Sequence, residues 1–196
     1  MEASKSDPRA YPMANDALTT KILNLVQQAS NVNQLKKNGV TPLSNACQAG
    51  FVDVVRLLLG ATNIDINQED EDILTPLNIA CDEGKIEIVK WLLKEGIDVN
   101  TELDKNGIRT LILAAQNDHK ELCKLLLAKG AEIDAATKDG IRALMPAAQN
   151  GHEEMCKLLL NNGAGVNAVN KDGWRALMFA AKNGHRLICE LLLLGN

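Results

Sequence analysis

The feature that most constrains this chain is an internal repeat with a period of about 33 residues. A glycine, a histidine and a cysteine each recur three times at one constant interval, as Gly107, Gly140 and Gly173, His119, His152 and His185, and Cys123, Cys156 and Cys189. An Asn or Asp recurs at nearly the same interval over five positions: Asn33, Asn67, Asn100, Asp134 and Asn167. A period of this length indicates a solenoid in which similar units stack on one another.

Each unit contains a turn signal followed by two segments of helical character. In the fourth unit the turn is Lys138-Asp139-Gly140, the first segment is RALMPAAQNG and the second is HEEMCKLLL. Leu144, Ala147 and Ala148 of the first segment have the i, i+3, i+4 spacing of one helix face. The second segment is apolar over more than one face, which favours a helix buried between neighbours.

The units resemble ankyrin repeats. Thr41-Pro42-Leu43 and Thr75-Pro76-Leu77 match the family's first signature, Gly151-His152 and Gly184-His185 match its second, and Ile97-Asp98-Val99-Asn100 matches its exit. The resemblance covers about residues 14–196 and implies an all-α ankyrin-repeat solenoid, with a β-turn tip and an antiparallel helix pair in each repeat. The expected organisation is a flexible tail (1–13), an N-terminal capping half-repeat (14–37) and five repeats (38–70, 71–104, 105–137, 138–170 and a truncated 171–196).

The third to fifth units depart from the family pattern at one position. Arg109, Arg142 and Arg175 stand where the pattern has the threonine of its first signature. The loss of that hydroxyl removes a helix cap worth ~1 kcal/mol at each site. We therefore expect stacking between units, rather than capping, to hold these three units.

The three His-x-x-x-Cys pairs suggest metal sites, a redox device or a purely structural role. Each helix offers two ligands, whereas a structural zinc usually needs four. Equivalent positions in stacked helices lie about 8–10 Å apart, which is too far for one ion or for a disulfide. In the family alignment, Cys123, Cys156 and Cys189 occupy a position where Val is usual, and the histidines occupy one that links neighbouring loops. The structural interpretation is therefore preferred, with no metal and no cofactor.

Composition and motifs exclude several functions. The net charge of −4 argues against general nucleic-acid binding, which depends on basic surfaces. No secretory signal is visible, and no apolar stretch is long enough to span a bilayer. The five cysteines are an odd number and lack the dense spacing of a secreted disulfide scaffold. A cytoplasmic location is expected, with the nucleus left open. The sequence has no phosphate loop, no G-x-S-x-G and no H-E-x-x-H, so we do not expect an enzyme.

The resemblance implies that a protein partner binds the concave face and the turn tips. An apolar residue follows each turn, and Trp174 is the expected anchor because tryptophan is enriched in interface hot spots. Packing between neighbouring tips is the alternative role for these residues. For the arginines the alternative is pairing with turn carboxylates such as Asp104, Asp139 and Asp172. The predicted partner-binding residues are Val40, Leu74, Asp82, Glu83, Ile108, Arg109, Ile141, Arg142, Gln149, Trp174, Arg175 and Lys182.

The distribution of charge suggests an oriented partner. Basic residues gather in the third to fifth units, and the run Glu69-Asp70-Glu71-Asp72 makes the second unit acidic. The apolar Leu191–Leu194 with Phe179 lacks the polar outer face usual in a terminal repeat, so self-association through the C-terminal end is a further expectation. A segment of a larger scaffold or multidomain signalling protein and a pathogen effector are the alternative functions.

Overall fold

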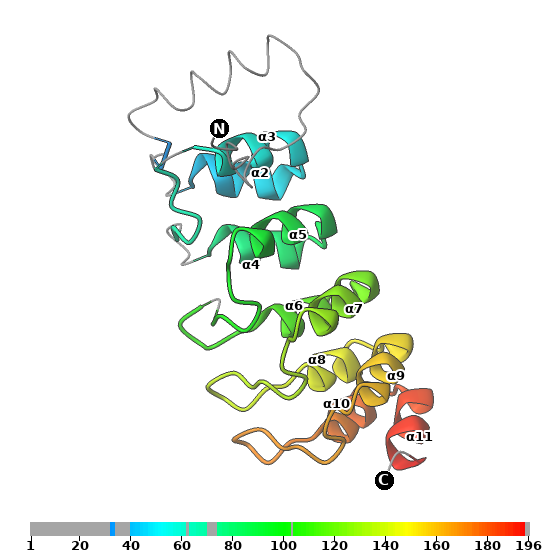
Figure 1. Ribbon diagram of the computed structural model, residues 1–196. Coiled ribbons are helices and arrows are strands. Elements are labelled where there is room, and N and C mark those ends of the chain that lie inside the picture. Colours follow the sequence, from blue (N-terminus) through cyan, green and yellow to red (C-terminus); the bar gives the residue numbers. More distant parts are fainter. Residues whose placement is uncertain (1–31, 34–39, 62, 70–73, 103, 195–196) are drawn as a thin grey trace, which may run out of the picture.

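The computed structural model describes residues 32–33, 40–61, 63–69, 74–102 and 104–194. Within these residues the chain forms ten helices and no strand. The helices form five consecutive pairs: α2 (Pro42–Ala49) with α3 (Val52–Leu59), α4 (Pro76–Asp82) with α5 (Ile86–Lys94), α6 (Thr110–Gln116) with α7 (Lys120–Ala128), α8 (Leu144–Gln149) with α9 (Glu153–Asn161), and α10 (Ala176–Lys182) with α11 (Arg186–Leu194). Figure 1 shows the pairs stacked one on the next, with the loops that join them projecting to one side as tips. The all-α repeat solenoid that the resemblance implied is confirmed.

The start of the stack lies only partly within the described residues. The predicted tail (1–13) lies outside them, and so does the predicted capping half-repeat (14–37), except for Val32 and Asn33. Asn33 and Asn100 make equivalent contacts with the following unit. Each donates from Nδ2 to a carbonyl 30 residues later, at 2.6 and 3.1 Å, and accepts at Oδ1 from an N–H 32 residues later, at 2.9 Å in both cases. Asn33 therefore occupies the same structural position relative to the next unit as Asn100 does.

The first helices begin in two different ways. Thr41 and Thr75 cap α2 and α4, because their hydroxyl oxygens accept from the N–H three residues later, at 3.0 and 3.4 Å. Arg109 and Arg175 occupy the same position before α6 and α10 and make no side-chain cap bond. The predicted loss of the cap in these units is thus seen at both sites.

The core is a ladder of equivalent apolar positions in successive units. One leucine of each of the first four first helices is almost completely buried (Leu43, Leu77, Leu111 and Leu144). Burial of such a side chain stabilises the fold by roughly 1.5–3 kcal/mol. An alanine three residues later is also buried in these units and in α10 (Ala46, Ala80, Ala114, Ala147 and Ala180), and its small volume lets neighbouring first helices approach closely.

The cysteines extend this core rather than interrupt it. Cys123 and Cys156 are fully buried at the position that Val55 and Val89 occupy in the first two units. Cys189, the equivalent residue of α11, is half-buried. The prediction that cysteine replaces valine at a packed apolar site is confirmed for the third and fourth units.

The last pair exposes side chains whose counterparts are buried. Met178 of α10 is exposed, whereas the equivalent Met145 and Ile112 are buried between helix pairs. Leu193 of α11 is exposed too, whereas the equivalent Leu127 and Leu160 are half-buried. Leu194 is exposed at a position that is exposed in the third and fourth units as well. The burial of this face in each earlier unit comes from the pair stacked on it. Self-association through this end stays a prediction.

Candidate functional site

The five apolar residues that follow the turns lie in one row along the tips. We call this set the tip row, and all its members are half-buried: Val40, Leu74, Ile108, Ile141 and Trp174. Three tips hold their member in the same way. Asp104 Oδ1, Thr137 Oγ1 and Asn170 Oδ1 accept from the backbone N–H four residues later, at 2.8, 3.1 and 2.8 Å. These bonds set the direction in which Ile108, Ile141 and Trp174 leave the turn.

Neighbouring tips are also joined by their backbones. Lys138 N–H donates to the Asn106 carbonyl at 2.7 Å, and Lys171 N–H donates to the Asp139 carbonyl at 2.9 Å. The tips therefore form a continuous ribbon in the third to fifth units. The tip row still remains half exposed, so packing between tips does not remove it from a partner's reach.

Trp174, the expected anchor, packs on the first helix of its own unit. Its ring centroid lies 5.1 Å from that of Phe179, with the two planes tilted by 47°. The ammonium of Lys182 lies 5.3 Å from the centroid of the Trp174 ring. An indole held on two sides loses little rotamer freedom when a partner covers its exposed part.

The three predicted arginines make contacts within the chain, but with other partners than those expected. Arg109 pairs with Glu102 at 3.1 Å and donates to the Asn100 carbonyl. Arg142 donates to the carbonyls of Gly140 and Val169, at 3.4 and 3.1 Å. Arg175 donates to Asn167 Oδ1 at 3.3 Å and stays exposed.

The alternative role, pairing with turn carboxylates such as Asp104, Asp139 and Asp172, is therefore seen among the described residues only for Arg109, and with Glu102 as the carboxylate. Asp104 accepts backbone N–H groups of its own turn, and Asp139 lies 3.9 Å from Lys171. The physical reason is the length of the arginine side chain. The guanidinium fork extends to carbonyls of the exit loops, which lie beside the tip.

The histidines fix the ends of the first helices. His119, His152 and His185 each direct Nε2 at a carbonyl of the preceding unit, at 2.7, 2.9 and 3.0 Å. These carbonyls belong to the last residues of α4, α6 and α8: Asp82, Gln116 and Gln149. Since a carbonyl oxygen only accepts, Nε2 carries the proton in each contact. The expected link between neighbouring loops is confirmed.

Four of the five thiols are poor nucleophiles because they are buried. Burial raises the pKa of Cys47, Cys123 and Cys156 to about 12, and it raises the pKa of Cys81 still further. A thiol must ionise to attack or to bind a metal. In the part of the chain that the structure describes, no group of three or more His, Cys, Asp or Glu residues is arranged to hold a metal ion.

The predicted polar residues stand at the C-terminal ends of the first helices, and we call this edge of the surface the border. Asp82, Glu83, Gln149 and Lys182 are all exposed there. Asn117 orients Asp82, because its Nδ2 donates to Asp82 Oδ1 at 2.8 Å. Glu83 lies 3.8 Å from Lys85. Acidic groups thus occupy this border in the second unit, and Lys182 occupies it in the fifth.

A further row of apolar side chains was not predicted. We call it the helix row, and its members stand at one equivalent position of the first helices and are half-buried: Ile79, Leu113, Pro146 and Phe179. The contact of Phe179 with Trp174 joins this row to the tip row. An apolar residue recurs at this position with the period of the repeat, so the row could have been found from the sequence. Because each member adjoins buried Leu and Ala residues, the pattern predicts a core position instead.

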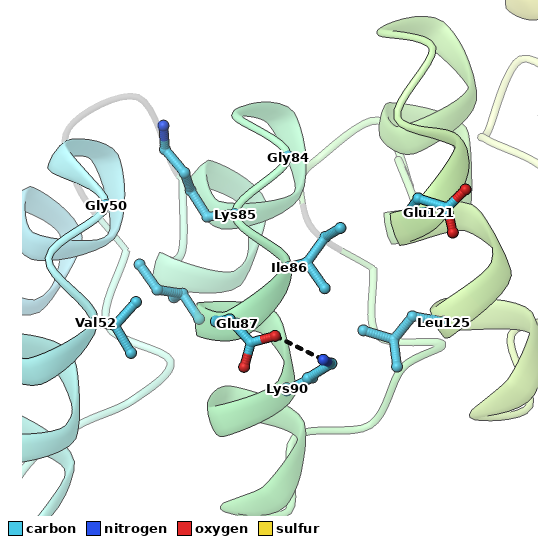
Figure 2. Close-up of a pocket in the computed structure, with 10 residues that line it drawn as sticks. Gly50, Val52, Gly84, Lys85, Ile86, Glu87, Lys90, Glu121 and Leu125 are labelled. Carbon is cyan, nitrogen blue, oxygen red and sulfur yellow. Dashed lines mark hydrogen bonds and ion pairs between the residues drawn. The ribbon is translucent and has the colours of Figure 1, made fainter.

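Two hollows differ in their relation to these rows. One, of ≈ 220 Å³, is lined by the following residues of both rows and the border: Gln48, Leu74, Asn78, Ile79, Asp82, Glu83 and Leu113. The larger, of ≈ 580 Å³, lies among the second helices α3, α5 and α7 (Figure 2). Two of its four charged residues, Glu87 and Lys90, pair with each other at 2.6 Å, as the dashed line in Figure 2 marks. Its described lining includes none of the predicted partner-binding residues.

Among the described residues, no helix has both the length and the apolar character that a bilayer span requires.

Part of the chain is similar to NHP2-like proteins and to ribonucleoprotein-associated proteins. It is 43% identical over 60 residues to the NHP2-like protein 1 homolog of Drosophila melanogaster, a match that covers 31% of this chain and 46% of that protein. It is 36% identical over 63 residues to the 13 kDa ribonucleoprotein-associated protein of Saccharomyces cerevisiae, with coverage of 32% and 49%. The NHP2-like protein 1 of Xenopus tropicalis is 33% identical over 66 residues, with coverage of 34% and 51%. The chain spans about half the length of the curated relatives it matches.

A family model extends much further along the chain. The model described as ankyrin repeats (3 copies) matches residues 13–103 and 104–196. It leaves only residues 1–12 unmatched, so most of the 60 residues shared with the Drosophila relative lie within the matched region. The helix pairs, the tips and the His contacts agree with this match, and the chain belongs to the ankyrin repeat family.

Proposed function

We propose that this chain is a non-catalytic interaction module that binds a partner protein along the tip row and the helix row. Ankyrin repeats are protein–protein interaction modules, and the question for this chain is which surface does the binding. The observation that carries the proposal is the continuity of two half-buried apolar rows, joined by the contact between Trp174 and Phe179. Apolar surface of this kind, rimmed by charge, marks protein contacts.

The charges at the border give the partner a direction. Asp82 and Glu83 lie at the second unit, whereas Arg175 and Lys182 are exposed at the fifth. A segment with basic groups toward the second unit and acidic groups toward the fifth fits this arrangement. Such complementarity governs specificity and association rate more than it governs affinity.

The test compares two double variants in affinity capture, read by mass spectrometry. Trp174→Ala with Arg175→Glu changes the proposed surface. Trp91→Ala with Lys90→Glu is the matched control, because it removes the other tryptophan and reverses one charge on the second helix α5. We expect a set of proteins that is lost from the first variant and kept by the control, with both variants folded in urea titrations. Identical sets from the wild type and the first variant would refute the proposal.

A second candidate function is association with a ribonucleoprotein. The observation in its favour is the identity of 36% over 63 residues to a 13 kDa ribonucleoprotein-associated protein. The net charge of −4 favours contact with a protein component over direct contact with RNA. Sedimentation of a cell extract tests it. The chain is expected in fast-sedimenting fractions that RNase shifts to slower ones, and a profile insensitive to RNase would eliminate this candidate.

A further inference from the structure

We propose that the hollow between α2, α4 and α6 binds the side chain of an arginine or a lysine from the partner. This inference rests on the proposed function, since it assigns one contact on the same surface. The hollow measures ≈ 220 Å³. Ligand pockets for drug-sized molecules usually measure roughly 300–1,000 Å³, so this volume suits one long side chain better than a separate small molecule.

The lining of the hollow divides into an apolar floor and an acidic rim. Leu74, Ile79 and Leu113 are half-buried and provide the aliphatic surface. Asp82 and Glu83 are exposed at its edge. The side chains of arginine and lysine have the matching division, with an apolar stem that packs on hydrocarbon and a charged end that stays near water.

The rim carboxylates keep the capacity to accept a new donor. A carboxylate offers about four lone-pair sites, and Asn117 uses one of them on Asp82, at 2.8 Å. Glu83 and Lys85 lie 3.8 Å apart with both side chains partly exposed, and a pair of this kind contributes little. A guanidinium or ammonium group from a partner can therefore replace water at both carboxylates at small cost to the chain.

The end of helix α4 adds to the attraction for a cation. Asp82 is the last residue of α4 and Glu83 is its C-cap. The carbonyl end of a helix carries partial negative charge and favours cations. Because the Asp82 carbonyl already accepts from His119, this contribution is secondary to that of the two carboxylates. An anionic group would be repelled by the two carboxylates. A neutral apolar group would remove water from them without replacing its hydrogen bonds.

The corresponding positions in later units have different chemistry. Gln149 and Asn150 replace Asp82 and Glu83 in the fourth unit, and Lys182 and Asn183 replace them in the fifth. The cation-binding contact is thus confined to the second unit. It would place the partner's basic residue at the acidic end of the two rows and so fix the direction of the bound segment.

The contact can be tested without knowing the partner. The probe is N-acetyl-L-arginine N-methylamide, titrated into ¹⁵N-labelled protein, with the citrulline counterpart as a neutral ligand of nearly the same shape. We expect saturable shifts of the backbone amide signals of Ile79, Asp82, Glu83 and Leu113 with the arginine probe, at millimolar concentrations. The citrulline probe is expected to leave them in place.

Two variants of equal charge separate this contact from general attraction. Asp82→Asn with Glu83→Gln is expected to weaken the arginine probe about tenfold, because hydrogen bonds between charged groups are roughly twice as strong as neutral ones. Asp53→Asn with Glu87→Gln, on α3 and α5, removes the same charge from exposed sites and is expected to leave the affinity unchanged.

Equal shifts with citrulline, or equal weakening in both variants, would overturn the inference. The partner test through Trp174 is independent of this titration. Failure here with capture still dependent on Trp174 removes only the cation contact, whereas loss of the Trp174 effect removes the proposed function itself.

Discussion

Replacement of Gly151 by alanine tests whether the histidine contacts hold adjacent units together. Gly151 has φ +79°, and a Cβ atom on it would lie 2.7 Å from Cε1 and 3.0 Å from Nδ1 of His185. The imidazole would have to move, and its hydrogen bond to the Gln149 carbonyl, at 3.0 Å, would be lost. The substitution thus acts on one defined contact between the fourth and fifth units.

The expected magnitude has two parts. Holding alanine in the left-handed conformation costs roughly 1–2 kcal/mol. Loss of the hydrogen bond from His185 adds about 1 kcal/mol. Gly163 is the matched control, because it has φ +87° and a Cβ there meets no atom within 4 Å among the residues that the structure describes. We therefore expect Gly151→Ala to lower the free energy of unfolding by about 1 kcal/mol more than Gly163→Ala does.

The measurement is urea denaturation followed by circular dichroism, with the free energy of unfolding taken by linear extrapolation. In a His185→Ala background the clash is absent, so Gly151→Ala and Gly163→Ala are expected to cost the same. Equal costs in the wild-type background, or an excess cost at Gly151 that persists without His185, would refute the reasoning.

Three further predictions concern the cap and the thiols. Thr41→Ala is expected to lower the free energy of unfolding by ~1 kcal/mol, since it removes the cap on Ser44 N–H, and Thr101→Ala in an exposed loop is the neutral control in urea titrations. In a colorimetric thiol assay, Cys189 is expected to react in the native protein, whereas the four buried cysteines react only at the rate of unfolding. Stability is expected to fall between about pH 9 and 12. The thiols, with ordinary pKa 9.0, ionise in the unfolded chain but keep their proton in the folded one, where the pKa of Cys156 is about 12. Cys156→Val is expected to make this slope shallower by roughly 1.4 kcal/mol per pH unit, and an unchanged slope would contradict the assignment.

The sequence predicted the candidate site unevenly. The tip row was found from a position that recurs after each turn, and it is half-buried as that position implied. The helix row was missed because its members adjoin buried residues in the sequence: Ile79, Leu113, Pro146 and Phe179. In a short helix the sequence pattern does not show whether an apolar residue faces the core or the solvent. The bonds of Arg109 and Arg142 to exit-loop carbonyls were not predicted, since no motif in the sequence marks those carbonyls.

By itself, the sequence determined the period, the helix pair in each unit and the burial of cysteine at a valine position, because these depend on spacing within one unit. Only the tertiary structure decided which atoms meet between units. The His152 ring reaches a carbonyl 36 residues earlier, and Leu74 and Leu113 come together around one hollow although they belong to different units. Contacts of this kind depend on how far each pair is rotated and shifted on the next. That geometry results from the packing of all side chains in the interface, and a recurring motif within one unit does not encode it.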